Sequence, residues 1–282
     1  MTGHKGFIGS HFYDSYFKKH EIDTLDILDG VDLCGEFDIT SPEKYDLVIH
    51  LAAFNGTKFF YEKPYQVALN NTLPTINLLN KFKNSKAKFV FASTCEIFNG
   101  AIDKGFYEVP TDEEVPILFD DILNPRWSYS IPKALGENLV ANSGLNWLVY
   151  RFFNIYGPRQ KDHFIPEFLD RMIKGDYVIY GDDYRSFCFV DDAVAIMNKL
   201  HTKAENMIVN IGKNEEVLIS DVAKILMSLY GVDPNKLLIE GSPVGSVKRR
   251  CPNVELMQKI TGFRKYTSLE KGLKKVLEDF LC

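Results

Sequence analysis

The sequence has no paired cysteines and no long apolar run, and these absences exclude several classes of protein. Its five cysteines are odd in number, scattered and never arranged as CxxC, so we expect reduced thiols and no metal site. No apolar run is long enough to span a membrane, and the N-terminus lacks the basic-then-apolar order of a signal peptide. We therefore expect a cytoplasmic protein with no membrane partner.

The sequence also lacks an excess of positive charge. Its formal net charge is −5, which argues against a nucleic-acid partner. The 282 residues, 45% of them hydrophobic, are enough for one large domain or for two of unequal size. Composition therefore predicts an ordinary folded core and leaves the function open.

What the sequence does contain, almost from its first residue, is a glycine-rich loop. Gly3, Gly6 and Gly9 recur at every third position, with Phe7 and Ile8 between the last two. Glycines let backbone N–H groups close on a phosphate, and the helix expected to begin near Phe7 directs its positive end at the same anion. The loop predicts a dinucleotide ligand, although three glycines alone are more often a turn.

The strand that normally leads into such a loop is missing, because only Met1 precedes Thr2. That strand is usually central to the sheet, so its loss would leave the flanking strands unpaired. We interpret the chain as truncated, or its start as misassigned; the alternative is that another segment or another chain fills the gap. If neither holds, the sequence no longer predicts tight binding of the dinucleotide.

Apolar runs alternate with helical patterns through the first two-thirds of the chain. The predicted strands are Asp23–Ile27, Leu47–Leu51, Lys88–Ala92 and Trp147–Phe152, and the helices between them are Ser10–His20, Pro64–Lys83 and Tyr129–Ser143. This order predicts an α/β fold, a Rossmann-like doubly wound parallel sheet with helices on both faces.

From about Gly157 onward the pattern loosens. Short strands separate predicted helices near Pro166–Lys174, Asp191–Lys199, Ser220–Tyr230 and Ser268–Leu281. We therefore divide the chain into a dinucleotide-binding domain (residues 1–156) and a smaller C-terminal α+β lobe (residues 157–282), some segments of which return to the first domain. The lobe should close over the ends of the strands, where ligands of open α/β sheets bind.

Several residues fit the contacts that a dinucleotide needs. Asp26, at the end of a predicted strand, can accept hydrogen bonds from the adenosine ribose and would repel the extra phosphate of NADP. The alternative is a solvent-facing acid in an acidic stretch. The remaining candidates are Ile27 beside Asp26, Asp38 and Ile39 near the adenine, and Leu51, Ala52 and Ala53, where small residues after a strand let the cofactor approach the backbone.

Tyr129 and Lys133 stand four residues apart at the start of a predicted helix, so they share one face. A tyrosine with a pKa of about 10 is a poor base at neutral pH. A nearby ammonium group and an oxidised nicotinamide both favour the phenolate. Tyr129 could then take a proton from a sugar hydroxyl as hydride leaves the same carbon, with Thr94, at the end of a buried strand, sharing that proton. The alternative for Thr94 is a cap at the strand end.

Together these motifs resemble the extended short-chain dehydrogenase/reductase family of nucleotide-sugar epimerases, dehydratases and decarboxylases. The resemblance runs from Thr2 to the C-terminus in the family's order and spacing. Its segments are TGxxGFIGS from Thr2, His50–Ala53, Asn71 with Thr75–Leu79, Ser93-Thr94, Tyr129-x-x-x-Lys133, Arg151–Pro158, Gly181–Arg185 with Phe187, Val190 and Asp192, Asn210–Gly212, and Arg250–Asn253.

The resemblance implies a tightly held NAD that oxidises a nucleotide-diphosphate sugar at C4 and returns the hydride after the 4-keto intermediate has reacted or rotated. By the family's pattern Thr94, Tyr129 and Lys133 form the catalytic triad. Asn71, Ser93 and Phe152 would contact the cofactor. The implied substrate contacts are Phe153 and Asn154, and also Arg185, Arg250 and the weaker candidate Arg159, since a forked guanidinium suits a diphosphate. The alternative for each arginine is a surface ion pair.

The tripeptide Thr94-Cys95-Glu96 bears on which reaction follows. Relatives that remove water resemble Thr-Asp-Glu or Thr-Ser-Glu here, UDP-glucuronate decarboxylases resemble Thr-Ser-Glu, and simple 4-epimerases more often lack the acid. Glu96, a possible base for the C5 proton, therefore favours a 4,6-dehydratase or a decarboxylase. An epimerase that carries this acid stays open. Cys95 fits no group and is either a small buried filler or a weak acid.

Two other functions remain as alternatives. The chain could be a non-catalytic relative that binds NAD or a nucleotide, or a reductase that consumes NAD(P)H with a 4-keto sugar. The resemblance also implies a homodimer, paired through the helix that carries Tyr129 and the one before it, Leu69–Lys83.

Overall fold

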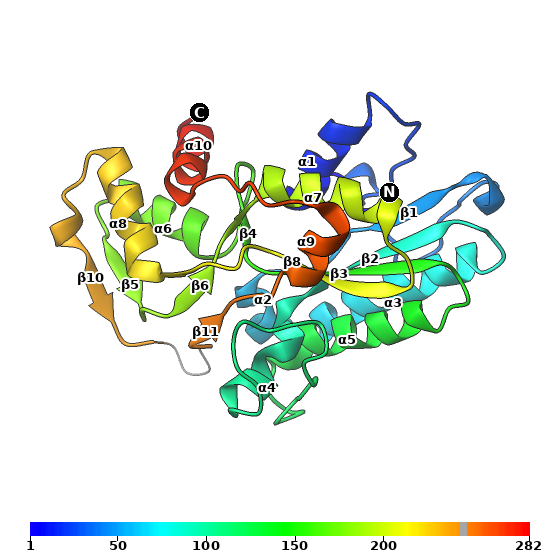
Figure 1. Cartoon of the computed structure of the whole chain (residues 1–282), viewed down its shortest axis with the longest axis horizontal. Coiled ribbons are helices and arrows are strands. Elements are labelled where there is room, and N and C mark those ends of the chain that lie inside the picture. The colour runs from blue at the N-terminus through cyan, green and yellow to red at the C-terminus, as the bar shows by residue number, and fades with distance from the viewer. Residues whose placement is uncertain (243–246) are drawn as a thin grey trace.

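A computed structural model describes residues 1–242 and 247–282. Figure 1 shows a parallel sheet with helices on both faces and a smaller lobe beside it. The strands are β1 (Leu47–His50), β2 (Lys88–Thr94), β3 (Trp147–Phe152), β4 (Ile155–Tyr156), β5 (Val178–Tyr180), β6 (Tyr184–Ser186), β7 (Cys188–Phe189), β8 (Met207–Ile211), β9 (Glu216–Leu218), β10 (Leu238–Glu240) and β11 (Arg249–Arg250).

The helices follow the predicted order, with additions. They are α1 (Phe7–Tyr16), α2 (Thr57–Glu62), α3 (Pro64–Phe82), α4 (Asn99–Asp103), α5 (Trp127–Ala141), α6 (Phe164–Ile173), α7 (Val190–Lys203), α8 (Ile219–Tyr230), α9 (Glu255–Thr261) and α10 (Leu269–Leu281). The short helices α2, α4 and α9 had no predicted counterpart. The other seven correspond to the seven predicted helices.

The main sheet is all parallel in the order β1-β2-β3-β8. Side chains alternate between its two faces, and both faces are covered. On one face Val48, Phe89 and Phe91 pack with Leu78 of α3 and Val140 of α5. The opposite face carries Ile49, Val90, Leu148 and Tyr150, against Phe12 of α1 and Met197 of α7. The prediction of a doubly wound parallel sheet is confirmed.

The place of the missing strand is filled by the first residues of the chain. Thr2 forms parallel bridges with both Leu25 and His50. The Thr2 N–H donates to Ile49 O over 2.9 Å, and the Gly3 N–H donates to Leu25 O over 3.1 Å. The expected strand Asp23–Ile27 is wrong, since only Leu25 of that segment is bridged. The neighbouring segment, Met1–Gly3, is so short that it bridges one residue of Asp23–Ile27.

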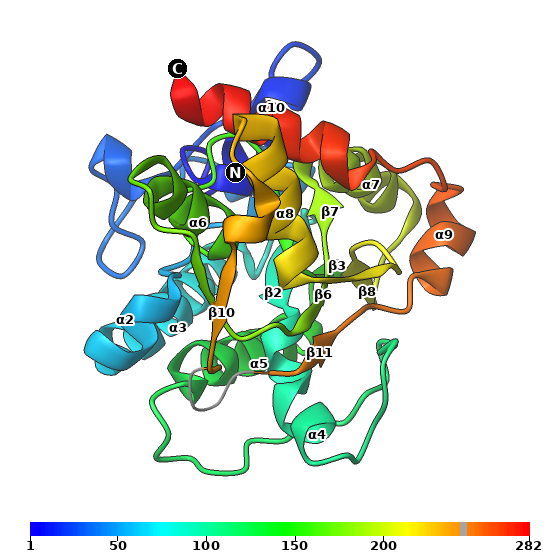
Figure 2. The ribbon, with the colours of Figure 1, turned by 90° about the vertical axis from the view of Figure 1, so that its left-hand side faces the viewer.

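The smaller lobe contains small sheets of order β11-β6-β9 and β10-β5, with α6, α8 and α10 around them (Figure 2). β8 follows α7 and returns to the main sheet. One hydrophobic cluster joins Phe12 and Val90 of the first part to Phe168, Leu226 and Leu273 of the lobe. The division at residue 156 stays a prediction. Within the described residues, no helix is both long and apolar enough to cross a bilayer.

Helix α5 lies against β2 through a glycine, which generates a stability prediction. A Cβ on Gly136 would stand 2.4 Å from Cζ of Phe91, a fully buried ring. We expect Gly136→Ala to lower the free energy of unfolding by about 1–3 kcal/mol, the cost of overpacking, despite the better helix propensity of alanine. Urea unfolding measures this. Gly35→Ala, where the nearest atom would be 3.8 Å away, is the control, and equal stability of the two variants would contradict the prediction.

Candidate active site

The glycine loop is packed so tightly that side chains are excluded from it. Gly3 has a φ of +72°, and a Cβ there would lie 2.6 Å from the backbone N of Ala52. A Cβ on Gly9 would lie 1.9 Å from the carbonyl oxygen of Gly3, which accepts the Gly6 N–H over 3.1 Å. The glycines therefore allow the start of α1 to pack closely against Gly3 and against the segment that follows β1. This is the carboxyl end of the sheet, where dinucleotides bind.

The start of α1, at Phe7 and Ile8, can receive an anion. Gly6, which precedes the helix, provides no side-chain cap, and the first turn holds no acidic residue. The first N–H groups of a helix have no partner within it, and the positive end of its dipole attracts negative charge. The residues present therefore fit the pyrophosphate of a dinucleotide.

Asp26 lies beside this loop. Its side chain accepts hydrogen bonds from the backbone N–H of Lys5 (2.9 Å) and of Leu28 (3.0 Å). The residue is only 6% exposed, so the alternative of a solvent-facing acid is wrong. By contrast, Ile27 beside it is 65% exposed. The structure thus places a fixed carboxylate next to the phosphate-binding loop, where a ribose hydroxyl could reach it.

The other residues predicted to contact the cofactor have different surroundings in the structure. Asn71 uses its amide on the backbone, accepting from Phe54 N–H and donating to Phe54 O and Val67 O. It therefore fixes the chain after Leu51–Ala53. Asp38 borders a cavity of about 290 Å³, while Ile39 packs on the core under β1. Cofactor contacts for these residues, and for Phe152 at the end of β3, stay predictions.

The three predicted catalytic residues lie on two neighbouring elements, β2 and α5. Tyr129 and Lys133 lie one turn apart on α5, and Thr94 ends β2. The Tyr129 ring stacks on Phe60, with centroids 5.1 Å apart, and Lys133 Nζ lies 5.7 Å from the Tyr129 ring centroid. Lys133 Nζ donates to the carbonyl of Ala92 over 2.8 Å. All three predicted residues are buried.

Burial dominates the electrostatics of this group. It raises the pKa of Tyr129, and the charges of Glu96 and Cys95 act in the same direction. Burial also lowers the pKa of Lys133 to about 7, with Glu137 acting against that shift. The protein alone therefore keeps the proton on Tyr129. That Lys133 and an oxidised nicotinamide favour the phenolate stays a prediction.

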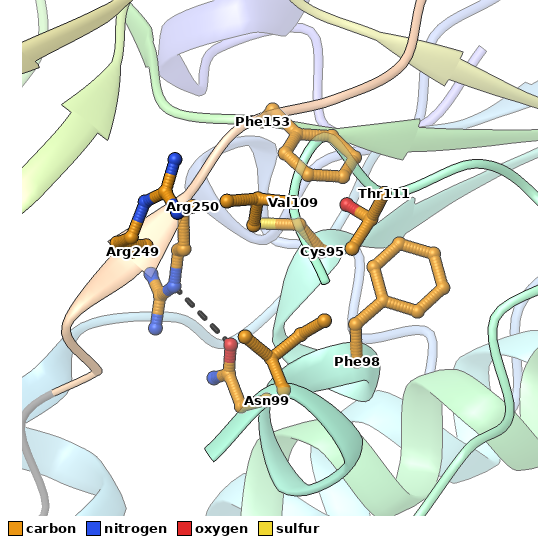
Figure 3. A pocket seen from close by; sticks show the side chains of 9 residues that line it. Cys95, Phe98, Asn99, Val109, Thr111, Phe153, Arg249 and Arg250 are labelled. Atoms are coloured by element: carbon orange, nitrogen blue, oxygen red, sulfur yellow. Dashed lines mark hydrogen bonds between the residues drawn. The ribbon is translucent and has the colours of Figure 1, made fainter. Parts of the chain in front are cut away.

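Glu96 is held as a carboxylate by a surrounding network. Its Oε1 lies 2.6 Å from Arg250 Nη1, and its Oε2 accepts the Asn99 amide over 2.5 Å and lies 3.8 Å from Arg126 Nη2. Arg250 Nε in turn donates to Asn99 Oδ1 over 3.2 Å (Figure 3). Burial alone would raise the pKa of Glu96, but Arg250 and then Arg126 outweigh it, so the pKa is lowered.

Cys95 behaves as a buried apolar side chain. It is 4% exposed and packs with Ile97, Phe98 and Phe153. Figure 3 shows it beside a small cavity that Arg250 also borders. Burial raises the pKa of its thiol to about 11, so the thiol is a weak acid. The surroundings favour the interpretation as a filler.

Two of the three candidate arginines lie together. Arg185 and Arg250 are register partners on the paired strands β6 and β11. Burial and then the charge of Arg250 lower the pKa of Arg185 to about 10. Arg159 is placed elsewhere: its guanidinium pairs with Asp14 of α1 over 2.8 Å, and its backbone N–H donates to Asp279 of α10. All three arginines are ion-paired, since Arg250 contacts Glu96 over 2.6 Å and Arg185 Nη2 lies 3.5 Å from Asp183. A role for Arg185 and Arg250 in binding a diphosphate stays a prediction.

The sequence pattern missed three residues of this region. Arg126 lies one turn before Tyr129, and Glu137 lies one turn after Lys133, where it pairs with Arg151. Helical spacing from Tyr129 and Lys133 would have located the first two. Phe153 is buried, and Asn154, with a φ of 36°, follows it at the end of β3. Among the described residues no cluster of His, Cys, Asp and Glu could hold a metal ion.

Comparisons with known proteins agree with this geometry. Residues 1–212 match the NAD dependent epimerase/dehydratase family. The chain is 32% identical to UDP-N-acetyl-alpha-D-glucosaminuronate decarboxylase of Bacillus cytotoxicus, over 99% of this chain and 96% of that one. It is 28% identical to dTDP-D-glucose 4,6-dehydratase of Dictyostelium discoideum, over 81% of this chain and 61% of that one.

Among solved structures, UDP-glucose 4-epimerase of Thermotoga maritima, determined with UDP-glucose, superposes with a TM-score of 0.81. It is 26% identical, over 99% of this chain and 97% of that one. The chain belongs to the NAD-dependent epimerase/dehydratase family, within the extended short-chain dehydrogenases/reductases. It is an NAD-dependent enzyme of nucleotide sugars.

The glycine loop generates a prediction about cofactor binding. Gly9→Ala would force apart the backbones of Gly3 and Gly9, because the added Cβ would be 1.9 Å from a carbonyl oxygen. We expect affinity for NADH to fall at least about tenfold, which corresponds to about 1.4 kcal/mol. Fluorescence titration with NADH measures this. Gly241→Ala, at a glycine of the smaller lobe where the added Cβ would meet no atom within 4 Å, should bind as the wild type does, and unchanged binding by Gly9→Ala would contradict the prediction.

Proposed function

We propose that the protein decarboxylates a UDP-hexuronic acid after oxidation of the sugar at C4. The observation that carries this proposal is the state of Glu96, a carboxylate paired with Arg250 and facing Arg126 beside Tyr129. The 32% identity to a UDP-hexuronate decarboxylase over nearly the whole chain supports it.

The same network argues against dehydration. Loss of water across C5 and C6 needs a base for the C5 proton and an acid for the departing hydroxyl. Glu96 has a lowered pKa in its ion pair, which weakens it as a base. Cys95, the candidate for the acid, has a pKa raised to about 11 and packs among apolar side chains. Neither group suits the steps that a dehydratase requires.

Decarboxylation makes smaller demands on these residues. When bound, NAD would accept hydride from C4 and later return it. Tyr129 takes the C4 hydroxyl proton, assisted by Lys133 and Thr94, and is then a neutral hydrogen-bond donor. The C6 carboxylate is β to the new ketone, so the C5–C6 bond breaks and its electron pair moves into the ketone. The Tyr129 hydroxyl, whose raised pKa favours the neutral form, stabilises the enolate oxygen, and a solvent proton replaces carbon dioxide at C5.

The arginines would divide two anions between them. Arg185 and Arg250, adjacent on β6 and β11, face the diphosphate, with Phe153 and Asn154 beside the sugar. Arg126 is 13% exposed at its side chain, and its guanidinium donates no hydrogen bond to any part of the chain that the structure describes. Glu96 Oε2 lies 3.8 Å from its Nη2, beyond hydrogen-bond distance, and a partly buried guanidinium whose donors make no hydrogen bond is suited to a carboxylate. We assign it the C6 carboxylate.

The proposed reaction can be tested directly. Incubation of the enzyme and NAD with UDP-glucuronate or UDP-N-acetylglucosaminuronate should give a product lighter by carbon dioxide, detected by mass spectrometry. Tyr129→Phe should lower kcat by about 10²–10⁴-fold, since it removes the group that moves the proton. Tyr65→Phe deletes the same hydroxyl from a side chain that is 71% exposed and should be fully active. Loss of water, or an epimer of unchanged mass, would contradict the proposal.

The assignment of Arg126 predicts which sugar is bound. Arg126→Gln removes the charge proposed to bind the carboxylate, so Kd for the UDP-hexuronate should rise about 10–100-fold, as expected for a charge-assisted hydrogen bond. Binding of UDP-glucose, which lacks the carboxylate, should change little. Calorimetric titrations with both compounds test this. Arg264→Gln, at an exposed arginine whose guanidinium donates to the carbonyl of Phe263, is the control, and equal losses for both sugars would show that Arg126 does not recognise the carboxylate.

A further inference from the structure

Lys133 is an isolated charge in an apolar setting. It is 2% exposed, and its one hydrogen bond within the described residues goes to Ala92 O. Its Nζ stands 4.9 Å from the centroid of the Phe91 ring. The role proposed for Lys133 requires the ammonium form, because only a charged lysine favours the Tyr129 phenolate. Something else in the fold must stabilise that form.

Glu137 lies one turn further along α5 and is itself buried, at 5% exposure. Its Oε1 accepts the Ser93 hydroxyl over 2.5 Å and Arg151 Nε over 2.9 Å, and its Oε2 accepts Arg151 Nη2 over 2.7 Å. Three hydrogen bonds thus fix the carboxylate in one position. A bidentate pair of this kind combines strength with defined geometry.

Arg151 extends this contact into the rest of the fold. It lies on β3 and is 3% exposed, with its remaining Nη1 donating to Glu113 O over 2.7 Å. The Phe98 ring centroid lies 4.7 Å from its guanidinium carbon. The pair therefore joins α5, β2 and β3 to the segment that contains Glu113.

The position of Ser93 connects the pair to the candidate catalytic residues. Ser93 stands between Ala92, whose carbonyl accepts the Lys133 ammonium, and Thr94. We propose that the Glu137–Arg151 pair is a positioning element for the reaction: through Ser93 it fixes Thr94 relative to Tyr129, and through its carboxylate it favours the ammonium form of Lys133. This inference rests on the catalytic roles proposed for Tyr129, Lys133 and Thr94.

The other groups near Lys133 do not supply a negative charge. His50, on β1, has its pKa lowered to about 3 by burial and by Lys133, so its ring is neutral. Tyr129, on the same helix as Lys133, has a raised pKa and is neutral in the protein alone. Arg151, on β3, is a cation and is paired with the Glu137 carboxylate. Among the described residues Glu137 is the acid whose charge raises the pKa of Lys133.

The direction of the pH effect follows from these charges. Without the Glu137 carboxylate the pKa of Lys133 falls further, so Lys133 loses its proton at lower pH. The inactive pair, neutral Tyr129 with neutral Lys133, then forms at lower pH, because an uncharged lysine no longer favours the phenolate. The alkaline limb of kcat should move to lower pH, and at a pH above the pKa of Lys133 in both proteins kcat should fall about tenfold for each pKa unit lost.

The test must separate this role from a structural one. Removing one partner of a buried ion pair leaves an uncompensated charge and costs about 3–5 kcal/mol, whereas replacing both by apolar residues is often tolerated. We therefore choose the double variant Glu137→Leu with Arg151→Met. The matched control is Asp170→Leu with Lys174→Met, which removes an exposed ion pair of 2.7 Å on α6.

For the double variant we expect a folded protein by circular dichroism, a KM close to that of the wild type, kcat lowered about tenfold or more and an alkaline limb at lower pH. Wild-type kcat and pH profile in the folded variant would overturn the inference. If the double variant does not fold, Glu137→Asp, which keeps the charge, and Glu137→Gln, which removes it, are compared, and equal pH profiles for these two would overturn it.

A readout without substrate separates this inference from the proposed function. NMR titration with isotope-labelled lysine, in which Lys133→Met identifies the signal, should show a lower pKa of Lys133 in the double variant than in the wild type. An unchanged pKa would overturn the inference even if decarboxylation is observed. If Lys133→Met retains full activity, the proposed catalytic roles fail instead, whatever the titration shows.

Discussion

The structure depends on one constraint, the burial of a lysine between α5 and β2. An ammonium group loses its hydration there, and burial lowers its pKa to about 7. The surrounding architecture answers this cost. The carbonyl of Ala92 accepts a hydrogen bond, the Phe91 ring faces the charge, and the Glu137 carboxylate lies one turn away. Gly136 allows the close approach of helix and strand that brings these groups together.

Much of the fold could be predicted from the sequence because its signals are local. The pattern Trp147–Phe152 corresponds to β3 without change, and Pro64–Lys83 corresponds closely to α3. The spacing of the glycines is enough to predict the loop. The backbones of Gly3 and Gly9 are in contact, so a side chain at Gly9 would clash, and this requirement is visible in the sequence. Hydrophobic periodicity is strongest in such long, regular elements.

The remainder could not be predicted because it depends on partners distant in the chain. The segment Asp23–Ile27 has the composition of a strand, yet its pairing depends on a distant residue, Thr2. Within this segment Thr2 bridges Leu25 alone. The ion pair of Arg151 with Glu137 joins a strand to a helix, and no sequence pattern announces it. Likewise, Arg159 and Arg250 both suit a phosphate in sequence terms. Only the fold shows that Arg159 faces Asp14 and that Arg250 contacts Glu96.

The hydrophobic cluster that joins the two parts of the chain has a consequence for how a substrate enters. Phe12 and Val90 belong to the same cluster as Phe168 and Leu226 of the lobe. Hinge motion between domains is expected where their interface is small and polar. Here a hinge motion between the two parts would expose this shared core to water at a cost proportional to the apolar area. We therefore expect a bound substrate to be accommodated by side chains and loops, with the shared core kept intact.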